Sequence, residues 1–382
     1  YKVHPCFQNG SKTGYKNGEW REEVRGIWVA KFEAGYASGN NNAPVKPSTV
    51  NYSQKHAWVW REEAGNTNDT VQTARNWLDG EYSVKNGSEY EWKDGKETPI
   101  KYPTFQGLTY SMSYISQDDA YRISKVLTEN GNIYGLDKNS TDSHLIKNSE
   151  WGAVAYLGQS KYGLDGKNIY INNVSISNSI QSVYTVTGCA GNKADASSIR
   201  ATIGAINNRT QSGIYTWTQK NGTTASSTGT IYGIYDMSGG TSERIAAIIN
   251  NKNEVLTNYG NKIMEESNNG DKSTKYITIY PHDTDKDNTS ISITTENRNK
   301  ASEANYKKNT KIYGDGIRET STVGTTKTAW YSDGTTIPAL NYPFFIRGRC
   351  NWETFNSGLF ATNYSNGFSS YSTGFRSVLV SL

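Results

Sequence analysis

The closing stretch "RGRCNWETFNSGLFATNYSNGFSSYSTGFRSVLVSL" constrains the fold more than any other part of the chain. No charged residue stands between Glu353 and Arg376, where aromatic residues alternate with Ser, Asn, Thr and Gly. The apolar run Val378–Val380 then predicts a buried terminal strand. Because that strand holds the stretch at its far end, we expect an ordered, displayed segment rather than a disordered tail.

Composition narrows the functional classes. The 382 residues include 27 Tyr and 10 Trp, which bury large areas and keep a polar group for interfaces. The formal net charge of +4 is mild, and no Lys/Arg run is interleaved with aromatics, so nucleic acid is not an expected partner. No apolar stretch approaches the roughly 18 residues of a membrane span, so membrane insertion is not expected. The chain starts at Tyr1 without a signal-peptide pattern, so we expect a fragment or a processed product.

Two helices are predicted in the first half of the chain. The first covers residues 116–131, because Ser116 is a good N-cap and Asp118 and Asp119 favour a first turn. The second is predicted over residues 142–163, where apolar residues recur near 3.6-residue spacing. These apolar residues are Leu145, Ile146, Trp151, Val154, Ala155 and Leu157.

Short strands and long loops are predicted around these helices. Residues 25–36 and 231–240 have strand character, and the second of these enters a Gly turn. Residues 241–243 follow as an expected helix start. Residues 250–336 are rich in Asn, Lys, Thr and Asp, which indicates a loop-rich insertion with a few strands such as "KYITIYP". The chain therefore reads as a single α+β domain over residues 1–382.

An ordered series of landmarks resembles a known family. "GIWVAKFEAGY", "HLIKNSEWGAVAYL", "GIYDMSGG", "FIRGR" with a following Trp, and "GFRSVLV" occur in this order between Gly26 and Leu382. The series resembles the formylglycine-generating-enzyme-type branch of the C-type lectin fold. Within that branch the chain is most similar to the variable proteins of diversity-generating retroelements, found on bacterial surfaces and in phage tails. The resemblance implies two helices packed on small antiparallel sheets, with long loops and insertions.

The same resemblance implies a variable ligand-binding region over residues 347–376. In this family, adenines of AAY codons are rewritten by mutagenic reverse transcription. Such rewriting reaches Tyr, Phe, Ser, Asn, Thr, Arg, Cys and Gly among others, and never Trp, Glu, Lys, Met or Gln. Every residue after Glu353 and before Arg376 belongs to the accessible set. Trp352 and Glu353 lie outside that set and are expected to be scaffold.

A displayed recognition face is the expected role of this region. Tyr gives large rigid contacts, and Ser, Asn and Gly give adaptable hydrogen bonds, as in antibody paratopes. A competing interpretation is that several of these aromatic residues belong to the core. The candidate ligand-binding residues are Arg349, Cys350, Asn351, Thr354, Phe355, Asn363, Tyr364, Ser365, Asn366, Phe368, Ser369, Tyr371 and Ser372.

An enzyme of the formylglycine-generating type is the first alternative. Those enzymes use two closely spaced cysteines near an "RGG" motif, whereas here Cys350 has no nearby partner and Arg349 replaces the second glycine. The related iron-dependent sulfoxide synthases need three histidines, and the four histidines here share no metal-ligand spacing. His144 is interpreted as a helix residue without a metal. No metal or cofactor is therefore expected.

Two further sets of residues resemble a disulfide framework and a calcium-binding loop only in part. Cys6, Cys189 and Cys350 are too few for a disulfide framework and allow one bridge at most. Residues 283–296 have Asp at positions one, three and five of a calcium hand, but Asn288 replaces the Gly, so we interpret them as a hydrated acidic loop. The sugar-binding tripeptides "EPN", "QPD" and "WND" are absent.

The functional prediction is a non-enzymatic binding protein. The resemblance implies an extracellular position, on a virion tail or a bacterial cell surface, and a protein or glycan receptor on a cell surface as partner. A glycan-binding adhesin of fixed specificity is the second alternative, and it would use the same face. The family resemblance also leaves a homo-oligomer open, although the chain shows no coiled-coil heptads.

Overall fold

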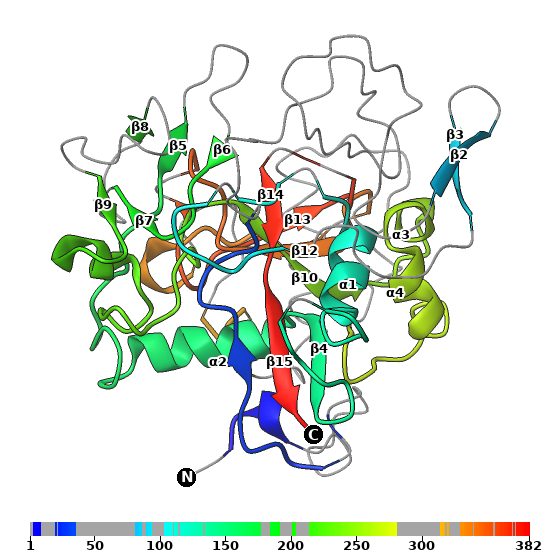
Figure 1. Cartoon of the computed structure of the whole chain (residues 1–382), viewed down its shortest axis with the longest axis horizontal. Coiled ribbons are helices and arrows are strands. Elements are labelled where there is room, and N and C mark those ends of the chain that lie inside the picture. Colours follow the sequence, from blue (N-terminus) through cyan, green and yellow to red (C-terminus); the bar gives the residue numbers. More distant parts are fainter. Residues whose placement is uncertain are drawn as a thin grey trace.

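The structure of the chain is a computed structural model. The described residues are 3–8, 20, 22–35, 81–85, 89–93, 103–109, 111–113, 115–132, 134–176, 184–191, 201–203, 214–280, 314–317, 319–320, 329–338, 340–353, 356–368, 370 and 372–382. Within them, few helices combine with small, mostly antiparallel sheets, so the α+β class is confirmed (Figure 1).

The central sheet is built around β10 (Ser242–Ile249), all of whose residues are buried. Along one edge β10 pairs antiparallel with β12 (Phe344–Arg347), which in turn pairs with β13 (Thr362–Ser365). Along the other edge, the first half of β10 pairs parallel with β14 (Thr373–Phe375) and the second half with β11 (Thr278–Tyr280). The C-terminal segment thus supplies two strands of this sheet.

A second, three-stranded sheet is centred on the closing strand. The predicted terminal strand is confirmed as β15 (Ser377–Ser381), in which Val378 and Val380 are fully buried. It lies between β1 (Trp28–Val29) and β4 (Thr141–Leu145) and pairs antiparallel with both. Figure 1 shows β15 running from the centre of the molecule to the end marked C. The segment before it is therefore fixed at its far end.

The two longer helices lie beside these sheets (Figure 1). α1 (Gln117–Lys125) begins as predicted, because the Ser116 side chain accepts a hydrogen bond from the Asp119 backbone N–H. It ends at Lys125, earlier than residue 131. α2 (Asn148–Gln159) begins where the Glu150 carboxylate accepts a hydrogen bond from the Lys147 N–H, at 2.9 Å.

The remaining elements are short and lie mainly between α2 and the central sheet or at the periphery. They are η1 (Pro5–Phe7), β2 (Glu81–Lys85), β3 (Glu89–Lys93), β5 (Val174–Ile176), β6 (Tyr184–Thr185), β7 (Cys189–Ala190), β8 (Ala201–Ile203), β9 (Tyr215–Thr216), η3 (Lys220–Ala225), α3 (Glu254–Tyr259), α4 (Asn261–Glu266) and η6 (Trp330–Ser332).

Strand β10 divides the hydrophobic core into two main clusters. Ala246 and Ile248 pack into the cluster that contains α1 residues. Ile245, Ala247 and Ile249 pack into the cluster that contains α2 and β15 residues. Because successive side chains of a strand point to opposite faces, a strand buried on both faces needs a continuous apolar run. That explains the sequence "IAAII" at this place.

Three secondary-structure predictions are wrong. Residues 141–145 form β4 rather than the start of the second helix, because β15 pairs with them, and His144 is a strand residue opposite Val378. Residues 241–243 begin no helix, since β10 starts at Ser242. Residues 231–240 are turns rather than a strand; Asp236 has φ 63°, and its carboxylate accepts hydrogen bonds from Gly188 N–H at 2.8 and 3.0 Å.

The region 250–336 is more ordered than predicted where it is described. The strand expected in "KYITIYP" is present as β11, and α3 and α4 precede it. The acidic loop 283–296 lies outside the described residues, so the calcium question stays open. All three cysteines are buried and free, so no disulfide forms.

Candidate functional site

The predicted variable region, residues 347–376, is fixed at both ends by buried arginines. At the start, Arg347 donates to the Ala361 carbonyl at 2.9 Å and to the Asp315 carbonyl at 2.8 Å, and it is fully buried. At the end, the guanidinium of Arg376 forms a fully buried ion pair with Glu243, at 2.6 Å. Charged groups in such positions are tolerated only when they are fully paired. Both arginines therefore belong to the scaffold.

The first three candidate residues lie inside the protein. Arg349, Cys350 and Asn351 are 6%, 3% and 0% exposed, so their assignment to a displayed face is corrected. Arg349 instead pairs with Glu353 at 2.9 Å and donates to the Thr336 hydroxyl at 2.9 Å. These contacts join the start of the segment to a neighbouring loop.

The backbone of Arg349 has a conformation that is unusual for a residue with a side chain. Its φ is 59°, in the left-handed region that glycine adopts readily and other residues adopt at a cost. The hydrogen bonds of the Arg349 side chain offset part of this cost.

Cys350 has an environment that disfavours thiolate chemistry. Burial raises the pKa of the Cys350 thiol well above its usual range, and the neighbouring Glu353 carboxylate raises it further. The sulfur lies 3.5 Å from that carboxylate. Since the thiolate is the reactive form, the thiol is a poor nucleophile at neutral pH.

The half-exposed candidates lie on β13 and the turn that follows it. Asn363, Tyr364, Asn366 and Phe368 are each partly exposed, whereas Ser365 is buried. The Tyr364 ring packs edge-on against Tyr342 with centroids 4.8 Å apart. The Phe368 ring lies 6.2 Å from that of Tyr259. Each of these two aromatic side chains thus packs partly against the scaffold and is partly exposed to solvent.

The turn between β13 and β14 is held through its main chain. The fully buried Arg244 of β10 donates to the Phe368 carbonyl at 2.7 Å and to the Thr373 hydroxyl at 2.9 Å. The Gly367 carbonyl accepts a hydrogen bond from Gln117 N–H, at 2.8 Å, at the start of α1. Gly367 itself has φ 86°, a conformation that favours glycine. Two side chains of the turn add to these contacts: Ser365 Oγ accepts a hydrogen bond from Gly367 N–H at 3.0 Å, and Asn366 Oδ1 accepts one from Phe368 N–H at 3.4 Å.

One further described candidate, Ser372, directly precedes β14. Ser372 is half-buried; its hydroxyl lies 2.9 Å from that of Ser370, and its carbonyl accepts a hydrogen bond from Ser242 N–H at 2.8 Å. The other four lie outside the described residues: Thr354, Phe355, Ser369 and Tyr371.

Sequence reasoning missed the residue that supports this turn most directly. Arg244 was placed near a helix start, whereas it reaches from the middle of the central sheet to Ile115, Phe368 and Thr373. The available signal was a charged pair, Glu243 and Arg244, next to a continuous apolar run. Such charges are buried only when they have partners, so the pair marks an internal polar network.

The described histidines show no metal-ligand arrangement. Among the described residues, no group of three His, Cys, Asp or Glu side chains is placed to hold a metal ion. His144 instead lies between two carboxylates: its Nε2 is 2.8 Å from Glu150 and its Nδ1 is 3.5 Å from Asp142. These carboxylates raise its pKa against the effect of burial. His56 and His282 lie outside the described residues.

Within the described part of the chain, no helix has the length and apolar character needed to cross a membrane. No model of a known protein family matches the chain, and no curated protein matches its sequence.

Proposed function

We propose that this chain is a non-enzymatic recognition protein with a C-type lectin fold of the formylglycine-generating-enzyme type. In this proposal the segment 363–372 contacts a protein or glycan receptor on a cell surface. The observation that carries the proposal is the main-chain anchoring of the turn by Arg244 and Gln117, beneath side chains that are half-exposed.

Main-chain anchoring separates the shape of the surface from its chemistry. The carbonyls of Gly367 and Phe368 are present whatever side chains surround them, so these two anchors remain when Tyr364 is substituted. A surface that is rigid before binding loses little conformational entropy on binding. This arrangement supports a role for the segment as a replaceable contact surface on a fixed support.

The side chains of the segment suit that role. Tyr and Phe in a polar surround are frequent anchors of binding energy. Tyr364 and Phe368 are the described aromatic residues that are partly exposed here, and Tyr371 is the third aromatic candidate in the sequence. The Asn and Ser residues between them supply adaptable donors and acceptors.

Cys350 supports recognition over the enzymatic alternative. A thiol-exchange enzyme needs an accessible thiolate, whereas Cys350 is 3% exposed and has a raised pKa. No observation specifically favours an enzyme. The proposal therefore keeps the extracellular role, on a virion tail or a bacterial surface, with diversification of residues 354–375. A reverse transcriptase gene and a template repeat beside the coding sequence would be the genetic counterpart of this role.

A triple substitution tests the proposal. We expect Tyr364→Ala, Phe368→Ala and Tyr371→Ala together to abolish binding to intact bacterial cells of a panel that the unmodified chain labels in flow cytometry. The melting temperature should fall by only a few degrees, because the described members of the set are half-exposed.

The matched control is Tyr162→Ala, which removes an aromatic residue that is 74% exposed and lies outside the segment. It should leave cell binding unchanged. Binding retained by the triple variant would contradict the proposal, and a large loss of stability with binding intact would show that these aromatics are core residues.

A further inference from the structure

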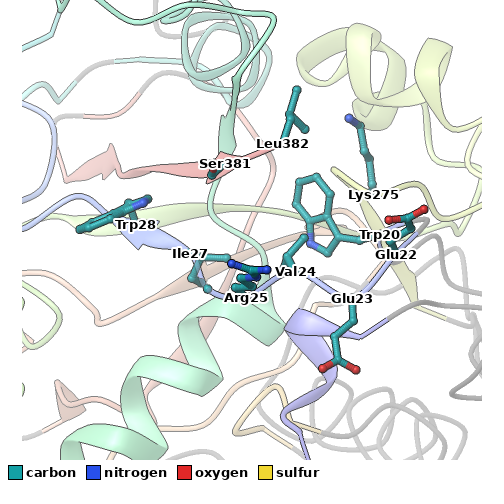
Figure 2. Close-up of a pocket in the computed structure, with 11 residues that line it drawn as sticks. Trp20, Glu22, Glu23, Val24, Arg25, Ile27, Trp28, Lys275, Ser381 and Leu382 are labelled. Atoms are coloured by element: carbon teal, nitrogen blue, oxygen red, sulfur yellow. The ribbon is translucent and has the colours of Figure 1, made fainter.

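A cavity of about 1140 Å³ lies at the end of the molecule where β15 finishes. Figure 1 places this end of β15 away from β13 and β14, so the cavity is separate from the proposed receptor face. Its walls are residues 20 and 22–28, together with Lys275, Ser381 and Leu382 (Figure 2). The volume is slightly above the range of about 300–1000 Å³ that is usual for ligand pockets.

The indole of Trp20 is fixed at one side of this cavity. Its ring lies 5.7 Å from that of His144, while the ammonium groups of Lys275 and Lys147 lie 5.3 and 5.9 Å from its centre. Trp20 is 4% exposed, yet its Nε1 has no hydrogen-bond partner among the described residues. A buried N–H usually has an acceptor. Trp20 is therefore a fixed wall of the cavity, and its N–H is enclosed beneath the cavity surface.

Trp28 stands at the opposite side of the cavity from Trp20 (Figure 2). Its side chain is 72% exposed although it is a strand residue, paired across β1 and β15 with Leu379. Backbone pairing fixes the position of the residue while the indole stays in solvent. An exposed indole held in this way offers a flat apolar surface beside polar groups.

The charges around the cavity balance. Glu22 and Glu23 are acidic, Arg25 and Lys275 are basic, and Figure 2 shows Glu23 pointing away from the centre. A polyanion would be repelled by the carboxylates, and a lipid chain would have to desolvate several charged groups. A metal ion is disfavoured too, because no three metal-ligating side chains converge among the described residues. A neutral ligand that carries many hydroxyl groups avoids all three conflicts.

We propose that this cavity, the Trp20–Trp28 pocket, binds a neutral oligosaccharide. The Trp28 indole packs against the apolar face of a sugar ring, the Trp20 ring forms a fixed wall, and the Arg25 guanidinium donates to sugar oxygens. Glu22 accepts hydrogen bonds from sugar hydroxyls. This binding is independent of the receptor face, and each can fail without the other.

A glycan array probed with the unmodified chain and five variants tests the pocket. The probes are neutral oligosaccharides of glucose, mannose, galactose and N-acetylglucosamine, beside sialylated and sulfated glycans and a set of immobilised peptides. We expect binding to at least one neutral series. Trp28→Ala should weaken it by about tenfold or more, and Arg25→Met by about threefold to tenfold.

A blocking variant makes the test independent of removed contacts. A Cβ added at Gly26 meets no heavy atom within 4 Å, so Gly26→Phe keeps the fold and places a ring at the cavity wall. It should also weaken binding by about tenfold or more. Tyr162→Ala, and the pair Tyr364→Ala with Phe368→Ala, should leave glycan binding within about twofold of the unmodified chain.

Each other result overturns the proposal. These results are an absence of neutral glycan binding, binding confined to anionic glycans or to peptides, and neutral glycan binding that survives Trp28→Ala and Gly26→Phe. Loss of glycan binding in the Tyr364 and Phe368 variant would assign the sugar to the C-terminal face instead.

Discussion

The C-terminal segment and the Trp20–Trp28 pocket are held in opposite ways. In the segment, the buried Arg244 grips a main-chain carbonyl, and the side chains above it are half-exposed. In the pocket, the contacts hold a side chain: the Trp20 ring is enclosed by His144, Lys147 and Lys275. The first arrangement tolerates changes of side chain, whereas the second depends on the identity of the residue. A single domain can in this way carry one surface suited to variation and another suited to constancy.

The largest expected effect comes from removing the support of the segment. Arg244→Met removes the side-chain hydrogen bonds to the Ile115 carbonyl, the Phe368 carbonyl and the Thr373 hydroxyl. Each unpaired buried group costs about 1–3 kcal/mol, so the free energy of unfolding should fall by about 3 kcal/mol or more. Chemical denaturation followed by tryptophan fluorescence measures this change.

Lys275→Met is the matched substitution at the pocket. The Lys275 side chain is 37% exposed, and its partner Asp142 keeps a hydrogen bond of 2.7 Å from the Tyr276 hydroxyl. The expected loss of stability is therefore about 1 kcal/mol or less. Equal losses in the two variants would contradict the distinction between main-chain support in the segment and side-chain support in the pocket.

A pH titration separates the two regions further. Burial raises the pKa of Asp333 to about 8 from an ordinary value of 3.8, and its carboxylate accepts a hydrogen bond from Phe360 N–H in the segment. Because the folded state holds this proton more tightly, stability is highest below the ordinary pKa of 3.8 and falls as pH rises from about 4 towards the raised value of about 8.

Asp333→Asn should remove this contribution from the stability profile. His144, below the pocket, has a raised pKa. Its stabilisation is complete below its ordinary value of 6.5 and is lost as pH rises through the folded value. Between pH 4 and 6 the unmodified chain should therefore lose stability relative to the variant. This range lies below the pH at which His144 loses its proton. Parallel profiles would rule out a buried, protonated Asp333.

The smallest expected effect concerns Arg349. Both Arg349→Gly and Arg349→Ala lose the hydrogen bonds to Glu353 and Thr336. Only glycine also relieves the positive φ, so the glycine variant should be more stable than the alanine variant by about 1 kcal/mol. Thermal unfolding of the two proteins measures the difference, and an alanine variant of equal or higher stability would argue against strain at this position.

Local signals were sufficient for some elements. The start of α1 follows from Ser116 and the acidic residues after it, and the side-chain cap is present. The closing strand follows from a short apolar run after a charge-free stretch, and β15 is buried between two partners. In both cases the determining residues are neighbours in sequence, so a local pattern carries the information.

Other elements depend on distant partners, which a local pattern does not reveal. β10 has the Ala-rich apolar composition of a helix, and it is a strand because both of its faces and both of its edges are covered. β4 carries Asp142 and His144, and it is buried because Lys275 and Glu150 compensate them. In the candidate site, the burial of Arg349 and Asn351 depends equally on contacts across the fold.

The position of β15 has a consequence for how the protein is made. Arg376, directly before that strand, donates a hydrogen bond to the Ala30 carbonyl, a residue 346 positions earlier. β1 and β4 therefore cannot pair with β15 until the ribosome has synthesised residues 377–381. Contacts between residues so far apart in the sequence make folding slow. A product that stops before β15 lacks the strand that joins β1 to β4. Such truncated products would be open to proteases.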